Sequence, residues 1–366
     1  MNKAGIGKYA ESLLENVVKK SNINVLLCSN KKVVFDKEIY VEIINSRNLL
    51  GKVNSNLWFQ LILPSIIKKY RIDLFHGTMS ITPILSDVPS VVTIYDLVLE
   101  IFPKTMHWKN WLPLKILMKN SANKASRIIA ISENTKKDII KYFGISPDKI
   151  KVIYLGVDKN FSSQKNKNDE NILIRYNLLP GYILTVGTLE PRKNLIRLLN
   201  AYKMIVVSED SIPKLVIVGG QGWLKEDINK VIDTLGLTEK VVLTGYVSDS
   251  DLPALYRNAS VFVYPSLYEG FGLPPLEAMA CGTPVISSNV SSIPEVVGDA
   301  GLLIDPYRPE EVARAITLVL KDNGLRVRLN RTGLNRAGLF TWDKTARETI
   351  KLYQEVIEEN NHRRNK

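Results

Sequence analysis

Two glutamates eight positions apart, Glu269 and Glu277, flank a glycine-rich turn at Gly270 to Leu273. A strand-like run precedes the turn and a helix-like run follows it. Backbone amides in the first turn of such a helix, together with the helix dipole, form a site for an anion. The two carboxylates can hydrogen-bond hydroxyl groups of the same ligand. Taken alone, each glutamate could be a solvated surface charge, but the surrounding glycines and prolines favour a binding site.

The elements that must position this turn alternate regularly along the chain. Short β-branched runs are separated by segments of helical periodicity, which predicts an α/β fold with parallel sheets. In open parallel sheets, ligands bind at the carboxyl ends of the strands, where the glycine-rich loops of the second half lie. The expected strands are 24–28, 74–76, 91–95, 128–132 and 151–155, followed by 182–186, 214–218, 241–243, 261–264 and 284–287.

A polar stretch at 162–171 predicts a linker between two domains. We therefore expect an N-terminal domain at 1–160, a C-terminal domain at 172–340, and a final helix and tail at 341–366. Near the start, Gly5 and Gly7 precede an amphipathic helix and predict a loop of the kind that follows a strand. Only four residues precede Gly5, so we expect the first strand to be missing through a mis-assigned start or a truncation. That strand would be central, and its loss would leave two neighbouring edges unpaired.

The net charge of +12 is concentrated in the first half, where residues 1–160 carry 24 Lys and Arg against 13 Asp and Glu. Such an excess implies an anionic partner. The segment 102–119 interleaves two tryptophans with four lysines, which favours docking on an anionic membrane, although its apolar residues could instead be the inner face of a domain helix. These residues are Lys104, Trp108, Lys109, Trp111, Lys115 and Lys119.

Several classes of site and location are not expected. The histidines and cysteines lack metal-ligand spacing, and Cys28 and Cys281 predict reduced thiols rather than a disulfide. No nucleic-acid recognition motif occurs, so nucleic acid is not an expected partner. The chain has no apolar stretch of membrane-spanning length and no secretion signal at its start, so we expect a cytoplasmic protein, peripheral at the membrane.

The segment from Glu269 to Glu277 resembles the E-x7-E region of family-4 retaining glycosyltransferases of the GT-B fold. The segment Gly187-Thr-Leu-Glu-Pro-Arg-Lys-Asn-Leu195 is similar to that family's loop after the first strand of the C-terminal domain. The resemblance extends across the chain, including Ser132-Glu133 and Gly156-Val-Asp158. It implies two Rossmann-like, doubly wound domains that face a central cleft, with the C-terminal helix packing back toward the N-terminal domain.

The resemblance also implies a reaction: retaining transfer of a hexose from an NDP-sugar to a glycan or lipid-linked glycan, without a metal or other cofactor. The form of residues 187–193 is similar to that of bacterial polysaccharide mannosyltransferases, which favours a mannose-type donor. Carried over, the catalytic residues are Arg192 and Lys193 on the donor diphosphate and Glu269 on the sugar, while Glu277 binds the ribose. Further donor-binding residues are Gly187, Thr188, Tyr246, Val247, Ser248, Gly270, Phe271, Gly272 and Leu273, and residues on the acceptor side are Gly5, Gly7, His76, Tyr95 and Asp96.

The chemistry of the residues agrees with this interpretation. Two fixed cations can stabilise the charge that a leaving nucleoside diphosphate gains, and a nearby carboxylate favours an oxocarbenium-like state. Because Glu269 and Glu277 come from one turn and helix, they cannot straddle a bond as the carboxylates of a hydrolase do. A nicotinamide enzyme is disfavoured, since the Gly219-Gly-Gln-Gly222 loop lacks the required spacing and acidic residue.

One departure from the family concerns Tyr95, which stands where relatives often have a histidine before Asp96. Tyrosine can donate a hydrogen bond but cannot carry a proton near neutral pH. A catalytically inactive GT-B binding protein is therefore one alternative, and a GT-B sugar-nucleotide epimerase is another, although the two intact motifs argue against both. His76 follows an apolar strand and could be a satisfied core histidine rather than part of the acceptor side.

Overall fold

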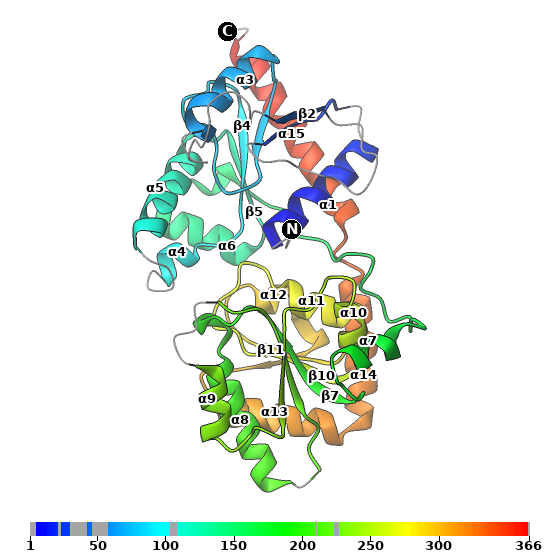
Figure 1. The fold of residues 1–366 in the computed structure, drawn as a ribbon. Helices are drawn as coiled ribbons and strands as arrows, with labels where there is room; N and C mark the ends of the chain where they lie inside the picture. The colour runs from blue at the N-terminus through cyan, green and yellow to red at the C-terminus, as the bar shows by residue number, and fades with distance from the viewer. Residues whose placement is uncertain are drawn as a thin grey trace. The chain divides into compact units, whose positions relative to one another are not determined.

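The computed structural model describes residues 5–20, 23–29, 42–45, 58–102, 108–209, 211–222 and 227–364 of the 366-residue chain. The chain forms two compact units, both visible in Figure 1. The first unit comprises Met1–Ile101, Trp108–Gly156 and Trp342–Lys366, and the second comprises Phe102–His107 and Val157–Thr341.

The polar stretch expected to be a linker lies inside the second unit, which is entered at Val157. Helix α7 (Asp169–Arg175) begins within this stretch. Oxygens of Asp169 accept hydrogen bonds from Nε and Nη2 of Arg257 at 2.9 and 2.6 Å, and Nη1 of Arg257 donates to the carbonyl of Ser162. These buried contacts with a distant arginine tie the stretch to the unit, and its local polarity gave no sign of them.

The second unit is built on one six-stranded parallel sheet with the strand order β12-β11-β10-β7-β8-β9. Its strands are rich in Val, Ile and Leu because both faces are covered, as is typical of parallel sheets. The strands are β7 (Tyr182–Val186), β8 (Leu215–Val218), β9 (Val241–Gly245), β10 (Ala259–Tyr264), β11 (Val285–Ser288) and β12 (Leu302–Ile304).

Helices cover both faces of this sheet (Figure 1). The main apolar core joins α8, α9 and α13 to one face, while α10, α11 and α12 pack on the opposite face. The helices are α8 (Leu195–Ser208), α9 (Ile228–Thr234), α10 (Leu252–Arg257), α11 (Leu273–Ala280), α12 (Ile293–Val297), α13 (Pro309–Lys321) and α14 (Asn323–Ala337), with short 3-10 turns η5 (Pro191–Lys193) and η6 (Gly298–Ala300).

The described strands of the first unit form two parallel sheets, β1-β2 and β3-β4-β5-β6. Strands β1 and β3 each have one edge that pairs with no other described strand. The strands are β1 (Leu26–Ser29), β2 (Glu42–Asn45), β3 (Phe75–Gly77), β4 (Ser90–Ile94), β5 (Arg127–Ala130) and β6 (Ile150–Val152). The helical elements are α1 (Gly5–Lys20), η1 (Trp58–Ile62), α3 (Leu63–Lys69), α4 (Val98–Ile101), α5 (Trp108–Lys124), α6 (Glu133–Asp138), η3 (Ile139–Phe143), η4 (Pro147–Lys149) and α15 (Trp342–Arg364).

The C-terminal helix α15 packs on the first unit, as expected from the family resemblance. Leu352 and Val356 of this helix are buried in one cluster with Val91, Ile129 and Ile153. The helix also lies against α1. Helix α15 therefore completes the core of the N-terminal half, although it is separated from that half in sequence by the whole second unit.

The expectation of a loop at Gly5 and Gly7 was wrong, because both glycines lie in the first turn of α1. Tyr9 and Leu13 are almost fully buried one and two turns later. The burial of the helix face that carries Tyr9 and Leu13 stabilises α1 from Gly5 onward, despite the low helix propensity of glycine.

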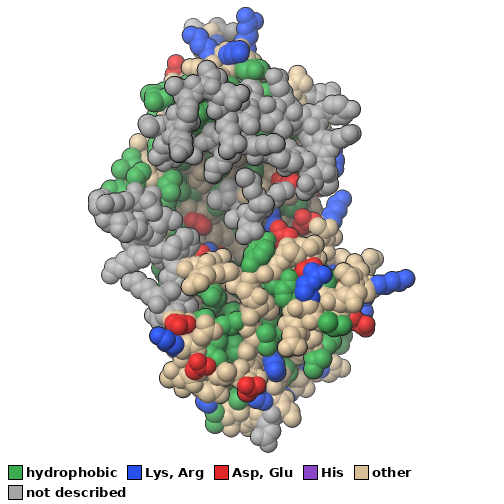
Figure 2. Space-filling view, in the orientation of Figure 1, with side chains coloured by type: hydrophobic (Ala, Val, Ile, Leu, Met, Phe, Trp, Pro, Cys, Tyr) green, Lys and Arg blue, Asp and Glu red, His purple; other side chains and the backbone are tan. Residues whose placement is uncertain are grey.

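The second unit has a near-zero formal charge by sequence, and its visible surface in Figure 2 shows acidic and basic side chains interspersed with apolar ones. Among the described residues, no helix is both long and apolar enough to cross a membrane.

Candidate active site

The loops that follow β7 and β10 meet because these two strands are parallel neighbours in the sheet. The amide of Leu267 donates to the carbonyl of Arg192 at 2.7 Å, and the hydroxyl oxygen of Ser266 lies 3.0 Å from the same carbonyl oxygen. Asn194 has a left-handed backbone (φ 62°), and its Nδ2 donates to the carbonyls of Pro265 and Pro306 at 3.0 and 2.7 Å. The sheet therefore brings together two motifs that lie more than 70 residues apart.

A compact charge cluster occupies this meeting point. Nζ of Lys193 lies 2.6 Å from Oε1 of Glu269, and Nη1 of Arg192 lies 2.8 Å from Oε2 of the same carboxylate. Nε of Arg192 also donates to Glu190 at 2.8 Å. The hydroxyl of Ser266 donates its proton to Oε1 of Glu269 at 2.7 Å. The three residues expected to be catalytic are thus in direct contact, and the two cations are balanced by two carboxylates.

The electrostatics of the cluster follow from its burial. Burial alone would raise the pKa of the Glu269 carboxyl, but the charges of Lys193 and Arg192, with hydrogen bonds from Lys193 and Ser266, lower it to about 2. Burial lowers the pKa of Lys193 below its usual value, although the charge of Glu269 opposes this shift. Glu269 is therefore ionised at neutral pH, and it stabilises the charged form of an otherwise desolvated lysine.

Glu277 lies in α11 and is buried rather than a surface charge. Its Oε2 accepts a hydrogen bond from the hydroxyl of Tyr256 at 3.1 Å. Tyr256 is fully buried in α10, with its ring edge-on to Phe161 and Phe262. A carboxylate held in this way is fixed in direction before any ligand arrives.

The turn from Gly270 to Leu273 is supported by the loop that follows β11. The hydroxyl oxygen of Ser292 lies 2.8 Å from the carbonyl oxygens of both Glu269 and Phe271, which share its one proton, and Ser291 accepts from the amide of Glu269 at 3.0 Å. Gly272 precedes α11 with φ of 118°, and a Cβ there would lie 2.8 Å from the Ile293 side chain. The turn thus requires glycine at this position for both conformation and space.

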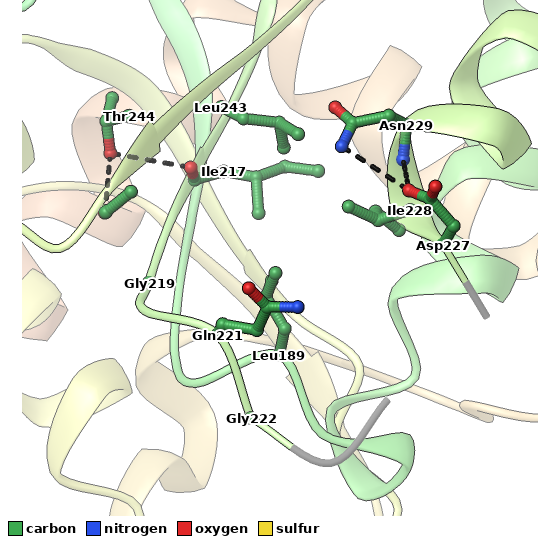
Figure 3. Close-up of a pocket in the computed structure, with 11 residues that line it drawn as sticks. Leu189, Ile217, Gly219, Gln221, Gly222, Asp227, Ile228, Asn229, Leu243 and Thr244 are labelled. Carbon is green, nitrogen blue, oxygen red and sulfur yellow. Dashed lines mark hydrogen bonds between the residues drawn. The ribbon is translucent and has the colours of Figure 1, made fainter. Parts of the chain in front are cut away.

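A pocket of about 820 Å³ opens at the carboxyl ends of β7, β8 and β9. Figure 3 shows Gln221 and Leu189 on one side of it and Leu243 and Ile228 on another, with the Asp227–Asn229 hydrogen bond at its rim. A Cβ on Gly219 would lie 2.0 Å from the carbonyl oxygen of Gly187, so only glycine lets these two loops approach. The lining residues are Leu189, Ile217, Gly219, Gln221, Gly222, Asp227, Ile228, Asn229, Leu243, Thr244 and Gly245.

The pocket and the charge cluster lie on either side of one loop. The amide of Gly187 donates to the carbonyl of Val218 at 2.8 Å, and the position of a Cβ on Gly187 lies 3.2 Å from Cε of Lys193. Thr188 contributes to the same loop, with its methyl carbon 2.7 Å from the position of a Cβ on Gly222. The predicted residues Gly187 and Thr188 therefore separate the pocket from the buried Lys193 and the partly buried Arg192.

The three predicted residues that follow β9 differ in their surroundings. Tyr246 is 54% exposed beside the pocket-lining Gly245, whereas the side chain of Val247 is buried in the core. The hydroxyl of Ser248 accepts from the amide of Asp251 at 3.2 Å at the turn before α10. The side chain of Tyr246 is thus the most accessible of the three.

The residues predicted for the acceptor side lie in the first unit, where several have structural partners. His76 contacts the Tyr353 hydroxyl through Nδ1 at 2.5 Å and the Thr93 hydroxyl through Nε2 at 2.8 Å. Burial lowers the pKa of His76 to about 3, so its ring is neutral at physiological pH. The hydroxyl of Tyr95 donates to the carbonyl of Thr78 at 2.6 Å. An acceptor-side role for His76 and Tyr95 stays a prediction.

Oδ1 of Asp96 accepts a hydrogen bond from the amide of Val98 at 3.0 Å, at the start of α4. Gly5 and Gly7 lie in α1, as described above.

Among the described residues, no group of three or more His, Cys, Asp and Glu side chains could hold a metal ion. Cys28 and Cys281 are both free thiols.

Several residues that hold the predicted ones in place could not be predicted from the sequence. They include a carboxylate, two tyrosines and several short polar side chains that act at a distance along the chain. A local signal exists for only three of them. Glu190 and Asn194 lie within the segment 187–195, and Ser266 lies in the loop before Glu269. The missed residues are Glu190, Asn194, Tyr256, Tyr264, Ser266, Ser291 and Ser292.

Comparisons with known proteins cover both units. The family model described as "Glycosyltransferase Family 4" matches residues 4–161, and the model described as "Glycosyl transferases group 1" matches residues 169–336. The chain is 33% identical over 289 residues to O-antigen chain mannosyltransferase B of Escherichia coli, covering 79% of this chain and 76% of the relative. It is 28% identical over 318 residues to O-antigen chain mannosyltransferase RfbU of Salmonella typhimurium, covering 84% and 85%.

Another relative is much longer: the serotype-specific mannosyltransferase WbdA of Escherichia coli is 31% identical over 239 residues, which span 64% of this chain and 29% of WbdA. Among solved structures, sucrose-phosphate synthase of Thermosynechococcus elongatus matches with a TM-score of 0.77 at 21% identity, over 97% of this chain and 94% of that one. Anabaena HepE, solved with UDP and glucose, matches with a TM-score of 0.76 at 19% identity over 97% of both chains. The chain is therefore a glycosyltransferase that belongs to family 4 and has the GT-B fold.

Proposed function

We propose that this enzyme transfers a hexose, with mannose as the favoured sugar, from an NDP-sugar to a glycan or lipid-linked glycan. The observation that carries the proposal is the contact of Arg192 and Lys193 with Glu269 at the strand ends, next to a pocket of about 820 Å³. The O-antigen mannosyltransferases among the relatives support the choice of sugar. HepE, solved with UDP-glucose, supports a nucleotide-sugar donor.

The arrangement suits the two ends of such a donor. The pocket has the volume of a small-molecule site, and its lining combines apolar side chains with the polar Gln221, Asp227, Asn229 and Thr244, which suits a nucleoside. We propose that Arg192 and Lys193, across the loop that carries Gly187, bind the diphosphate and that Glu277 binds the ribose. In this proposal Glu269 binds the sugar hydroxyls.

The same cluster supports a mechanism without a metal. As the glycosidic bond breaks, negative charge develops on the leaving diphosphate, and the two cations stabilise that charge. The sugar becomes oxocarbenium-like, and a nearby ionised carboxylate favours that state. We propose that the sugar keeps its anomeric configuration, as in the family that the two motifs resemble.

We also propose that the first unit docks on an anionic membrane surface, beside a lipid-linked acceptor. Leu112 and Ile116, one turn apart on α5, are 39% and 52% exposed, and Lys119 is exposed on the same helix. Lys115 is paired with Glu100 at 2.7 Å, so its charge is partly balanced within the unit. The side chains of Trp108, Lys109 and Trp111, and residues Lys104 to His107, lie outside the described residues.

The donor is tested by thermal shift with nucleoside diphosphates and NDP-sugars, followed by transfer assays. A ligand present at 100 times its dissociation constant stabilises the folded state by about 2.7 kcal/mol. We expect stabilisation by one nucleoside diphosphate and by its mannose conjugate, and unchanged transfer in EDTA. NMR of the product then reports its anomeric configuration. Absence of a shift with every nucleotide would refute the proposal.

A further inference from the structure

We propose that Tyr264 is a positioning residue of the donor site, whose hydroxyl holds Lys193 and Glu269 in one hydrogen-bonded set and keeps the lysine protonated. This inference rests on the proposed function for the roles of Lys193 and Glu269. Tyr264 itself ends strand β10 and is fully buried.

The geometry is a closed triangle of polar atoms. Nζ of Lys193 donates to the Tyr264 hydroxyl at 2.5 Å, and that hydroxyl donates to Oε1 of Glu269 at 2.8 Å. The third side is the Lys193–Glu269 contact of 2.6 Å. The ammonium also lies 4.9 Å from the centre of the Tyr264 ring, and the ring stacks on Phe262. A phenol is suited to this position because it accepts from a cation while donating to an anion.

The same hydroxyl gives Glu269 a neutral partner. The carboxylate accepts from two cations, Lys193 and Arg192, and from two hydroxyls, Tyr264 and Ser266. When a diphosphate recruits the cations, the two hydroxyls still satisfy the buried carboxylate. Without Tyr264, the movement of Lys193 toward phosphate would leave Oε1 with Ser266 as its one described partner.

The protonation of Lys193 depends on every charged group that faces the triangle. Burial disfavours its ammonium, and the nearby Arg192 adds repulsion, while Glu269 and Glu190 attract it. Glu277 on α11 also acts on Tyr264, whose pKa burial and the two glutamates raise well above its usual value. Tyr264 is therefore a neutral phenol throughout the working pH range. Its oxygen is a hydrogen-bond acceptor that opposes the loss of the Lys193 proton.

The test compares Tyr264→Phe with a matched control, Tyr182→Phe. Tyr182 is a buried tyrosine of the same sheet whose hydroxyl donates to the carbonyl of Leu255 at 2.7 Å. Both variants lose one buried hydroxyl, so similar falls in melting temperature are expected. Lysines labelled with 13C at Cε are titrated by NMR without substrate, and Lys193→Arg assigns the Lys193 signal. The pH profile of kcat/KM is measured in parallel.

We expect Tyr264→Phe to lower the pKa of Lys193 by about one unit, because it removes a hydrogen bond to the charged form. The pKa of the alkaline limb of the kcat/KM profile should fall by the same amount. Tyr182→Phe should change neither. An unchanged Lys193 titration in Tyr264→Phe would overturn the inference, whatever the activity. If the titration moves but the wild type transfers no sugar, the positioning role stands and the proposed function fails.

Discussion

The ammonium of Lys193 lies 2.6 Å from Oε1 of Glu269, and both side chains are buried. The pKa of Glu269 falls from 4.5 to about 2, so the folded state holds its proton less tightly than the unfolded chain does. Its contribution to stability is therefore complete above about pH 4.5 and is lost as the pH falls toward 2. If Lys193 binds the donor diphosphate as proposed, the diphosphate competes with Glu269 for it, and binding and stability are coupled at this pair.

Removing either cation should cost activity. We expect Arg192→Ala and Lys193→Ala each to lower kcat by about 100-fold or more, since each removes a group that stabilises charge in the transition state. Lys193→Ala should also lower the free energy of unfolding by about 3 kcal/mol, because it breaks a buried ion pair. Initial rates and denaturant unfolding measure the two effects.

The control for the loss of a cation is Arg175→Ala in the same unit. Arg175 pairs with Asp251 at 2.7 Å, but its side chain is 60% exposed and makes no described contact with the cluster. Its kcat should match the wild type, and far-UV circular dichroism should be unchanged in all three variants. Near-normal transfer by both Arg192→Ala and Lys193→Ala would show that the site lies elsewhere.

The two glutamates should separate binding from turnover. Glu277→Ala should mainly weaken nucleotide binding, because ribose contacts are equal in the ground and transition states, whereas Glu269→Ala should mainly lower kcat. Tyr256→Phe should weaken binding less than Glu277→Ala, since it only releases the carboxylate from its partner. Calorimetric titration of nucleoside diphosphate and steady-state kinetics measure these effects. Equal losses in both parameters for both glutamate variants contradict the assignment.

His76 should make the first unit sensitive to mild acid. Burial lowers the pKa of His76 from 6.5 to about 3. Between these two pH values, His76 is protonated in the unfolded chain but not in the folded protein. Stability should then fall by about 1.4 kcal/mol per pH unit as the pH drops from 6 to 5, where carboxylates contribute little. His76→Gln should reduce this slope, measured by calorimetry at several pH values. A wild-type transition independent of pH in this range would contradict the burial of the ring.

Membrane docking should depend on the exposed residues of α5. We expect wild-type protein to co-sediment with liposomes containing anionic lipid at low salt and to be released at high salt. A Leu112→Ser, Ile116→Ser, Lys119→Gln variant should bind less. The matched control is Lys203→Gln, Met204→Ser, Val207→Ser, which alters exposed apolar residues of α8 in the second unit. Wild-type protein that stays in the supernatant at low salt would rule docking out.

The sequence by itself determined the α/β class, most strand positions, and the residues of the two motifs. Strand β7 lies where it was expected, at Tyr182–Val186, because a β-branched run buried on both faces leaves a strong local pattern. Strand β12 was missed, since a three-residue strand with a partly exposed pattern gives little signal. The motif segments at 187–195 and 269–277 could be identified from the sequence because the glycines, prolines and charged residues of each lie close together in the chain.

Only the tertiary structure decided which partners those residues have. The pairing of β7 with β10 brings Lys193 to Glu269 and Tyr264, and no local pattern encodes this pairing. The same holds for His76, whose partner Tyr353 lies 277 residues away on α15. The protonation of Lys193 and of His76 depends on burial and on charges from distant segments. Secondary-structure propensity depends on residues that are close in sequence, whereas a pKa depends on groups that are close in space.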